Sequence, residues 1–203
     1  NRTSPKTQSA LLEVMEEGTA TVDGVTRKLP DPFVVIATEN PYGSSGTQML
    51  PESQLDRFMI CLSMGYPEHA DAVAILKGNA SNPLSKVEKV VGVEELVELR
   101  RESNDMFIRD EIYEYIVDLV EETRRNEIFS AGASPRGTIA LLNMAKAIAV
   151  IEGRDFVTAE DVQDVVRDTL GHRVKLGQKA RAQGMNMDRA MQTLIQTVRV
   201  PRM

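Results

Sequence analysis

Two unbroken runs of apolar residues stand out in the first seventy positions of the chain. The first is Phe-Val-Val-Ile-Ala at 33–37, and the second is Phe-Met-Ile-Cys-Leu at 58–62. A continuous apolar run of this length is typical of a strand that helices cover on both faces, as in a parallel sheet. Polar or turn-forming residues follow each run. We therefore predict buried strands over 33–38 and 58–66.

Capping and turn residues predict the elements around these strands. Ser4 can cap a helix that ends near Gly18, which suits a helix C-terminus. The sequence "TATVDGVTRKL" at 19–29 contains an Asp-Gly pair between two short extended arms, which favours a hairpin. "PESQLDRF" predicts a short helix with Pro51 at its start.

From residue 68 onward the apolar residues recur at helical spacing, and no strand is convincing. The pattern predicts helices over 68–78, 92–103, 110–125, 134–153, 158–170 and 187–198. Thr158 is a good N-cap for one of them, with Asp161 in its first turn. The fold class is therefore α/β followed by all-α, with a boundary near 66–80 that gives parts 1–70 and 71–203.

Composition narrows the class of protein. The 203 residues carry a net charge of −6, 4% of them are aromatic and none is Trp. A general nucleic-acid binder usually shows a basic face or stacking aromatic residues, so nucleic acid is an unfavoured partner. The single cysteine excludes an intrachain disulfide, and no run of eighteen apolar residues or signal peptide is present. We expect a soluble, cytoplasmic protein that does not enter a membrane.

Asn40 lies just beyond the first predicted strand. Ligands of open parallel sheets bind beyond the carboxyl ends of the strands. A carboxamide there can donate and accept hydrogen bonds, and so could hold a water molecule against a phosphate oxygen. The alternative is that Asn40 caps a turn before Pro41, and this stretch alone favours that alternative.

Two arginines are candidates for anion binding. Arg57 ends the short predicted helix, where its guanidinium could project outward, or instead pair with Asp56 or Glu52. Arg136 lies in the first turn of a helix that Ser134 caps. A cation there is unfavourable with respect to the helix dipole, so a nearby anion would justify it. The alternative is an exposed charge that costs a few tenths of a kcal/mol.

The other reactive side chains carry weaker signals. His69 and His172 have no metal-ligand spacing, and we expect ordinary surface or capping residues and no metal site. Cys61 falls inside a predicted buried strand, which predicts an inert core thiol.

Together these segments resemble the C-terminal two-thirds of a MoxR-type AAA+ ATPase. The matching stretches are "NRTSPKTQSALLEVMEEGTATVDGVTRKLPDPFVVIATENP", "GTQMLPESQLDRFMICLSMGYP", "GASPRGTIALLNMAKAIAVIEGRDFVTAEDV", "HRVKL" and "LIQTVRVPRM". The resemblance covers essentially the whole chain. It implies the sensor half of an AAA+ P-loop NTPase core, followed by a helical lid domain.

The resemblance also implies a role for each candidate residue. Asn40 matches sensor 1, which orients the attacking water and contacts the γ-phosphate. Arg57, in "LDRF", matches the arginine finger that is offered in trans to a neighbouring subunit's nucleotide. Arg136, in "SPR", matches the sensor 2 arginine, which reaches phosphate in its own subunit. The hairpin at 19–29 matches the insertion before sensor 1.

Two motifs of a working AAA+ ATPase are absent from the sequence. No G-x-x-x-x-G-K-[ST] loop is present to hold the phosphates of ATP, and no strand ends in the acidic pair that holds Mg²⁺. In the family, that acidic pair directly precedes the stretch that begins at Asn1. We therefore expect that this chain alone does not hydrolyse ATP, and that a longer parent does.

The resemblance implies that the parent forms a homo-oligomeric ring, a hexamer, and uses ATP hydrolysis to remodel or mature partner proteins, for instance by inserting a metal or cofactor. Partners in this family often carry von Willebrand factor A domains. Two alternatives stay open. One is a motor on nucleic acid, as in related helicases and clamp loaders, which the acidic composition disfavours. The other is a non-catalytic binding module or scaffold.

Overall fold

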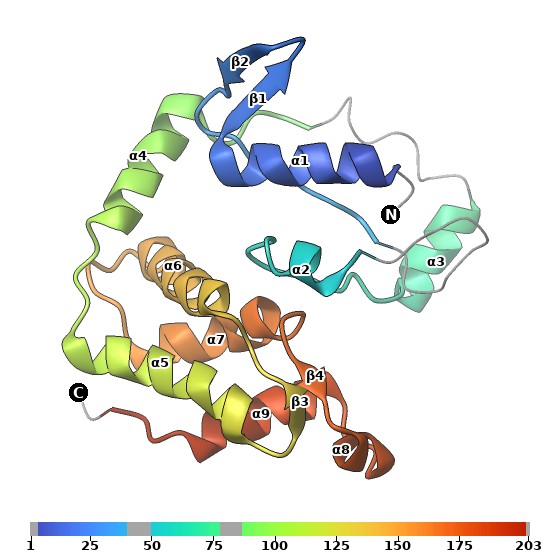
Figure 1. Ribbon diagram of the computed structural model, residues 1–203, viewed down its shortest axis with the longest axis vertical. Helices are drawn as coiled ribbons and strands as arrows, with labels where there is room; N and C mark the ends of the chain where they lie inside the picture. Colours follow the sequence, from blue (N-terminus) through green and yellow to red (C-terminus); the bar gives the residue numbers. More distant parts are fainter. Residues whose placement is uncertain (1–3, 40–49, 78–86, 202–203) are drawn as a thin grey trace.

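A computed structural model describes residues 4–39, 50–77 and 87–201 of the chain. Figure 1 shows two groups of elements, with α1 and a hairpin in one group and a helical bundle in the other. Helix α4 (Val93–Asn104) connects the two groups along one side, and helix α2 (Glu52–Leu55) lies between them. This arrangement places the start of the bundle next to the end of the first group.

The first group begins as its capping residues predict. Helix α1 (Pro5–Glu17) starts after Ser4, whose hydroxyl accepts a hydrogen bond from the amide of Thr7, and it ends at Gly18 in the left-handed conformation. Strands β1 (Thr19–Val22) and β2 (Val25–Lys28) form the antiparallel hairpin. Its turn residues, Asp23 and Gly24, both have positive φ, which explains the Asp-Gly pair.

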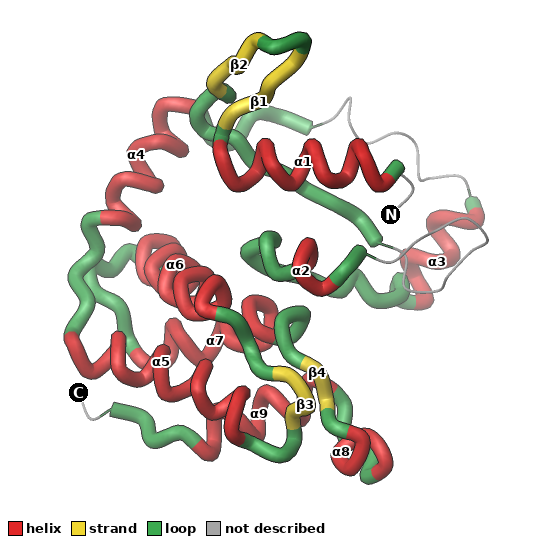
Figure 2. The backbone as a smooth tube through the Cα atoms, in the orientation of Figure 1, coloured by secondary structure: helices red, strands yellow, loops and turns green. Residues whose placement is uncertain are grey.

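The bundle contains the main core. Helices α5 (Asp110–Arg125), α6 (Pro135–Ile151), α7 (Ala159–Leu170) and α9 (Met187–Thr197) pack together, as Figure 2 shows in red. Each helix contributes side chains with no exposed surface; among them are Leu119, Leu141, Val166 and Leu194. These four helices match their predicted ranges within two residues, which confirms a helical second part.

Thr158 caps α7 as predicted. Its hydroxyl accepts a hydrogen bond from the amide of Asp161, and the Asp161 carboxylate accepts one from the Thr158 amide. Burial alone would raise the pKa of Asp161, but hydrogen bonds from Arg154 and Thr158 outweigh burial and lower that pKa. Helix α3 (His69–Leu76) also forms within its predicted range.

Three elements of the bundle were not predicted. Strands β3 (Phe129–Ala131) and β4 (Lys175–Leu176) pair as a small antiparallel sheet, although no strand was expected after residue 68. Helix α8 (Gln178–Ala182) follows β4. All three are five residues long or shorter, so they give too few positions for a periodic pattern.

The two buried strands predicted over 33–38 and 58–66 are not formed. Both segments lack regular secondary structure and lie outside any sheet, and Figure 2 shows no strand at either one. Ile36 and Met64 expose 89% and 99% of their surface. Cys61 is also exposed, so the prediction of a core thiol is wrong. In the described part of the chain no strand pairs with either segment, and a strand needs a neighbour for its backbone hydrogen bonds.

Helices that could cross a membrane are absent from residues 4–39, 50–77 and 87–201, because none is both long and apolar enough.

Candidate functional site

A cleft of about 200 Å³ is lined by residues of α1, of the segment after α2 and of α6. Its charged lining consists of two carboxylates and three guanidinium groups: Glu16, Asp56, Arg57, Arg136 and Arg173. We call this the arginine cleft. Two of its three arginines are the ones that the sequence singled out, and they come from opposite parts of the chain.

Arg57 follows α2 and turns toward α1. Its Nη1 forms an ion pair with Oε2 of Glu16 and lies 3.5 Å from the carbonyl oxygen of Leu12, to which it donates. The alternative pairing of Arg57 with Asp56 or Glu52 is wrong, since those carboxylates pair with Arg173 and with Lys175. Arg57 is therefore held by the end of α1, with 30% of its side chain exposed.

Arg136 reaches the same carboxylate from the other side of the cleft. Its Nη2 forms an ion pair with Oε1 of Glu16, while its side chain stays 47% exposed. Arg136 lies in the first turn of α6, where a nearby anion was expected. That anion is Glu16. One carboxylate bridges the two arginines, because each guanidinium takes a different oxygen.

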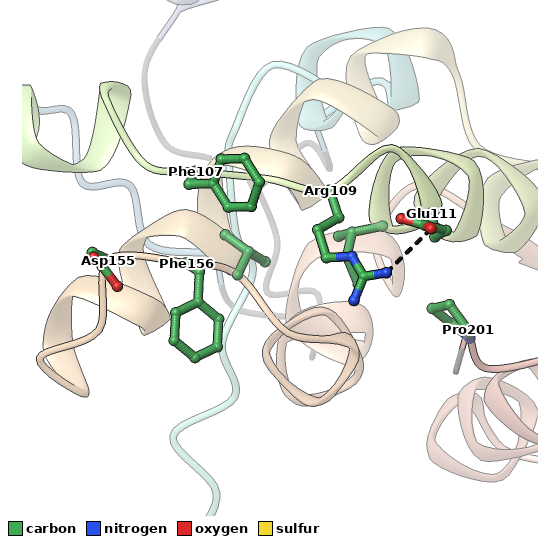
Figure 3. Close-up of a pocket in the computed structure, with 8 residues that line it drawn as sticks. Phe107, Arg109, Glu111, Asp155, Phe156 and Pro201 are labelled. Atoms are coloured by element: carbon green, nitrogen blue, oxygen red, sulfur yellow. Dashed lines mark hydrogen bonds and ion pairs between the residues drawn. The ribbon is translucent and has the colours of Figure 1, made fainter. Parts of the chain in front are cut away.

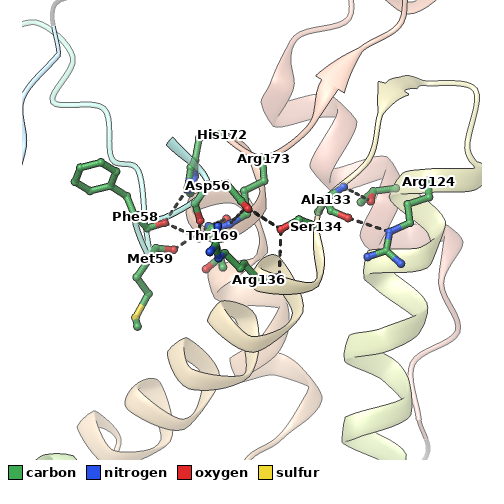
Figure 4. Close-up of polar contacts among 11 residues, drawn as sticks. Asp56, Phe58, Met59, Arg124, Ala133, Ser134, Arg136, Thr169, His172 and Arg173 are labelled. Atoms are coloured by element: carbon green, nitrogen blue, oxygen red, sulfur yellow. Dashed lines mark hydrogen bonds and ion pairs between the residues drawn. The ribbon is translucent and has the colours of Figure 1, made fainter. Parts of the chain in front are cut away.

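The start of α6 is fixed by hydrogen bonds on both sides (Figure 4). The Ser134 hydroxyl accepts from the Arg136 amide at 3.1 Å and donates to the Asp56 carboxylate, with 2.9 and 2.8 Å to its two oxygens. Behind it, Ala133 donates its amide to Thr123 and accepts at its carbonyl from Nε of Arg124. The position of Arg136 is therefore set by the bundle and by Asp56 together.

Arg173 was not predicted as a site residue, although it lies within the quoted stretch "HRVKL". Only 2% of its side chain is exposed. Its Nε donates to Oδ1 of Asp56 at 3.1 Å, and its terminal nitrogens donate to the carbonyl oxygens of Asp56 at 3.0 Å and Met59 at 3.0 Å. Further bonds reach the carbonyls of Phe58 and Thr169. Figure 4 shows these bonds converging on one guanidinium.

Arg173 thus fastens the chain that carries Arg57 to the end of α7. Burial lowers the pKa of Arg173, and the charge of Asp56 opposes that shift. An arginine stays protonated in proteins, so the pair remains ionic. Cys61 adds a backbone bond from its amide to the Asp168 carbonyl at 2.9 Å. No sequence pattern indicates this role, because burial of a single arginine depends on tertiary packing.

His172 is half-buried beside Arg173, so the expectation of an ordinary surface residue is wrong for it. Its Nε2 lies 3.1 Å from the Phe58 carbonyl oxygen. A carbonyl oxygen only accepts, so Nε2 of His172 is the donor of this hydrogen bond. Burial, and then the charge of Arg173, lowers the pKa of His172. His69, by contrast, is exposed as expected.

Asn40 lies outside the described residues, so its sensor 1 role stays a prediction. Within the described ranges, no three His, Cys, Asp or Glu side chains gather to hold a metal ion. The arginine cleft has a surplus of one positive charge, since three guanidinium groups face two carboxylates. These residues fit the phosphate groups of a nucleotide, while the two carboxylates that Mg²⁺ could use are already paired with arginines.

Comparison with known proteins gives the family. A model of the "ATPase family associated with various cellular activities (AAA)" matches residues 1–60, and a model of the AAA lid domain matches residues 121–199. The "Chaperone MoxR1" of Mycobacterium tuberculosis is 33% identical over 99% of this chain and 55% of its own length. The chain belongs to the MoxR family of AAA+ ATPases.

Two further matches cover the same span. The "Uncharacterized protein YeaC" of Bacillus subtilis is 45% identical over 99% of this chain and 63% of its own length. A crystal structure of a candidate ATPase from Cytophaga hutchinsonii superposes with a TM-score of 0.87 at 34% identity, over 100% of this chain and 64% of that one. The chain thus has the fold of part of a MoxR-type AAA+ core followed by its lid domain. It spans 55% and 63% of the length of these two curated relatives.

Proposed function

We propose that this chain supplies the arginine side of a nucleotide site in a MoxR-type, chaperone-like ATPase. The observation that carries the proposal is the Glu16 carboxylate, which bridges Arg57 and Arg136. Two guanidinium groups that share one carboxylate can equally share the oxygens of a phosphate group, because both anions accept the same paired hydrogen bonds.

In this proposal Glu16 occupies the place that a phosphate takes when nucleotide binds. ATP, when bound, supplies the phosphoanhydride bond whose hydrolysis drives the parent. The side chains of Arg57 and Arg136 neutralise negative charge on the phosphates. Asp56 and Arg173 hold the segment before and after Arg57, so its guanidinium needs little rearrangement.

The first experiment uses the 203-residue chain and inorganic tripolyphosphate in calorimetry. Glu16→Gln removes the competing anion, and we expect it to raise the affinity about tenfold, which is ~1.4 kcal/mol. Glu17→Gln changes an exposed neighbour on α1 and should leave the affinity unchanged. Adding Arg57→Ala or Arg136→Ala to Glu16→Gln should remove the gain. No gain in Glu16→Gln would refute a shared phosphate site.

The finer assignments concern the full-length parent, a homo-oligomeric ring that we propose to be hexameric and cytoplasmic. The residues that hold Mg²⁺ and make most contacts to ATP would be ones that this chain lacks.

Asn40 would orient the attacking water, so Asn40→Ala should lower kcat while KM moves little. An unchanged kcat would indicate that Asn40 caps a turn instead. The client would be a protein that the ring remodels or matures, such as one with a von Willebrand factor A domain.

The shared carboxylate also bears on which subunit's nucleotide each arginine serves. The resemblance assigns Arg57 to a neighbour's nucleotide and Arg136 to the subunit's own. Their common partner favours one nucleotide for both. Mixing either alanine variant with a variant that lacks the P-loop lysine tests this in the parent ring. Recovery of ATPase activity in both mixtures would place both arginines in trans, and recovery only with Arg57→Ala would keep Arg136 in cis.

A further inference from the structure

A second pocket, of about 320 Å³, lies at the other end of α6. Helix α6 begins at the arginine cleft and ends beside this pocket, and its 17 residues span roughly 25 Å. The lining comes from the linkers before α5 and α7, from the first turn of α5 and from the chain after α9; it includes Phe107, Arg109, Glu111, Asp155, Phe156 and Pro201 (Figure 3). We call this the phenylalanine pocket.

The pocket has a preformed backbone. Phe107 and Phe156 form an isolated parallel β-bridge. The Phe107 amide donates to the Asp155 carbonyl at 3.2 Å, and the Val157 amide donates to the Phe107 carbonyl at 3.2 Å. These bonds hold two aromatic side chains at the surface, where Phe107 is 64% and Phe156 is 43% exposed. Folding has left this apolar area uncovered, although the adjoining core is closely packed.

The charges around the two rings leave one carboxylate unpaired. Arg109 donates to Glu111 at 3.3 Å, so these two lining charges neutralise each other. Arg154, which stacks on Phe156 at 5.7 Å from the ring centroid, is paired with Asp161. Asp155 has no hydrogen bond or ion pair from its carboxylate within the part of the chain that the structure describes. The pocket therefore combines an apolar floor with one uncompensated negative charge.

We propose that the phenylalanine pocket binds a peptide segment of a partner protein, in which a bulky apolar side chain stands next to Lys or Arg. The apolar side chain enters between Phe107 and Phe156, and the cation pairs with Asp155. Exposed aromatic side chains around a pocket are typical anchors of protein interfaces. An anionic membrane surface is a poor occupant, because the unpaired carboxylate would repel it. This binding goes beyond the proposed nucleotide site and does not depend on it.

Fluorescein-labelled hexapeptides test the proposal by polarisation with the whole 203-residue chain. We expect Ser-Gly-Phe-Arg-Gly-Ser to bind about tenfold more tightly than the same peptide with Phe-Glu or Ser-Arg at its centre. Phe156→Ala should abolish binding. Asp155→Asn should keep binding of Phe-Arg measurable but remove its preference over Phe-Glu. Phe156→Leu, which keeps an apolar side chain, should retain part of the affinity if Phe156→Ala unfolds the site.

Two matched variants serve as controls. Phe33→Ala removes a phenylalanine that is also 43% exposed, but in the first part of the chain. Glu127→Gln removes an exposed carboxylate of the bundle. Neither should change the binding of the Phe-Arg peptide.

Three results would overturn the proposal. Equal affinity for the Phe-Arg and Ser-Arg peptides would show that the apolar side chain does not contribute to binding. A dimer that Phe107→Ala abolishes and Phe33→Ala leaves intact would make a second copy of the chain the occupant. A tenfold gain in affinity on removal of Arg202 and Met203, which lie outside the described residues, would assign the pocket to the chain's own end.

Discussion

Arg173 joins two stretches of chain that are more than a hundred residues apart. It donates to the side chain and carbonyl of Asp56 and to the carbonyls that follow Asp56. Removing one member of a buried ion pair leaves the other charge without compensation, which typically costs about 3–5 kcal/mol. Arg173 is therefore the residue of the arginine cleft whose loss should most affect stability.

Arg173→Met tests this role, because Met keeps an unbranched apolar stem and lacks the charge. We expect the free energy of unfolding to fall by about 3 kcal/mol in urea titration. Arg167→Met is the control, since Arg167 is 39% exposed and pairs with Asp188 at the surface. It should cost at most about 1 kcal/mol. Equal losses for the two variants would contradict a stabilising role of the buried ion pair between Arg173 and Asp56.

His172 should make stability depend on pH. Its folded-state pKa is lowered below the ordinary value of 6.5, by burial first and then by Arg173. The unfolded chain therefore binds a proton at a higher pH than the folded chain does. Stability from this group is complete above about pH 6.5 and is lost as pH falls below it, toward the folded pKa.

We expect the free energy of unfolding to decrease between pH 7 and pH 5, and His172→Gln to flatten that decrease. Gln can still donate to the Phe58 carbonyl, but it does not titrate in this range. His69→Gln is the control, because His69 is exposed on α3 and should leave the slope unchanged. A slope that His172→Gln does not alter would show that other groups cause it.

Sequence reasoning found the residues whose roles are local and missed those whose roles depend on packing. Ser4 and Thr158 were predicted as caps, because a cap bonds to amides two or three positions away. Arg57 and Arg136 were found as candidates, but nothing in the sequence showed that both contact Glu16.

The same division holds for helices and strands. The bundle helices were predicted well because an amphipathic helix satisfies its own backbone and shows its buried face in the sequence. The run at 33–38 reads as a buried strand, yet it pairs with nothing in the described residues. A strand is defined by its neighbours, so a correct apolar pattern alone could not predict its pairing.

The contact between β3 and α5 gives a prediction about packing. Gly132, just after β3, lies so close to α5 that an added Cβ would be 2.6 Å from Cγ of Arg124 and 2.8 Å from its Cα and N. Gly132→Ala forces these elements apart and should cost about 1–3 kcal/mol of unfolding free energy. At Gly92 an added Cβ would meet nothing nearer than 3.6 Å. Gly92→Ala should cost less than about 1 kcal/mol in the same denaturation series.

The molecule as a whole is joined differently from the division at residue 70 that the sequence suggested. That division stays a prediction, but residues 56–61 bond to His172 and Arg173, just after α7, and to the Asp168 backbone. Movement of the bundle would therefore carry the segment that bears Arg57 with it. The pair of arginines in the cleft would shift as one unit relative to any nucleotide bound elsewhere.

The uncovered segments 33–38 and 58–66 have a consequence for the behaviour of this chain in solution. They present exposed apolar side chains and have no strand partner in the described residues, which favours the growth of β-rich aggregates. We expect light scattering to increase with concentration, and Ile36→Lys together with Met64→Lys to suppress it. Val200→Lys, at a 41% exposed site after α9, should not. Aggregation of this chain would then depend on the same apolar residues whose pattern is typical of a buried strand.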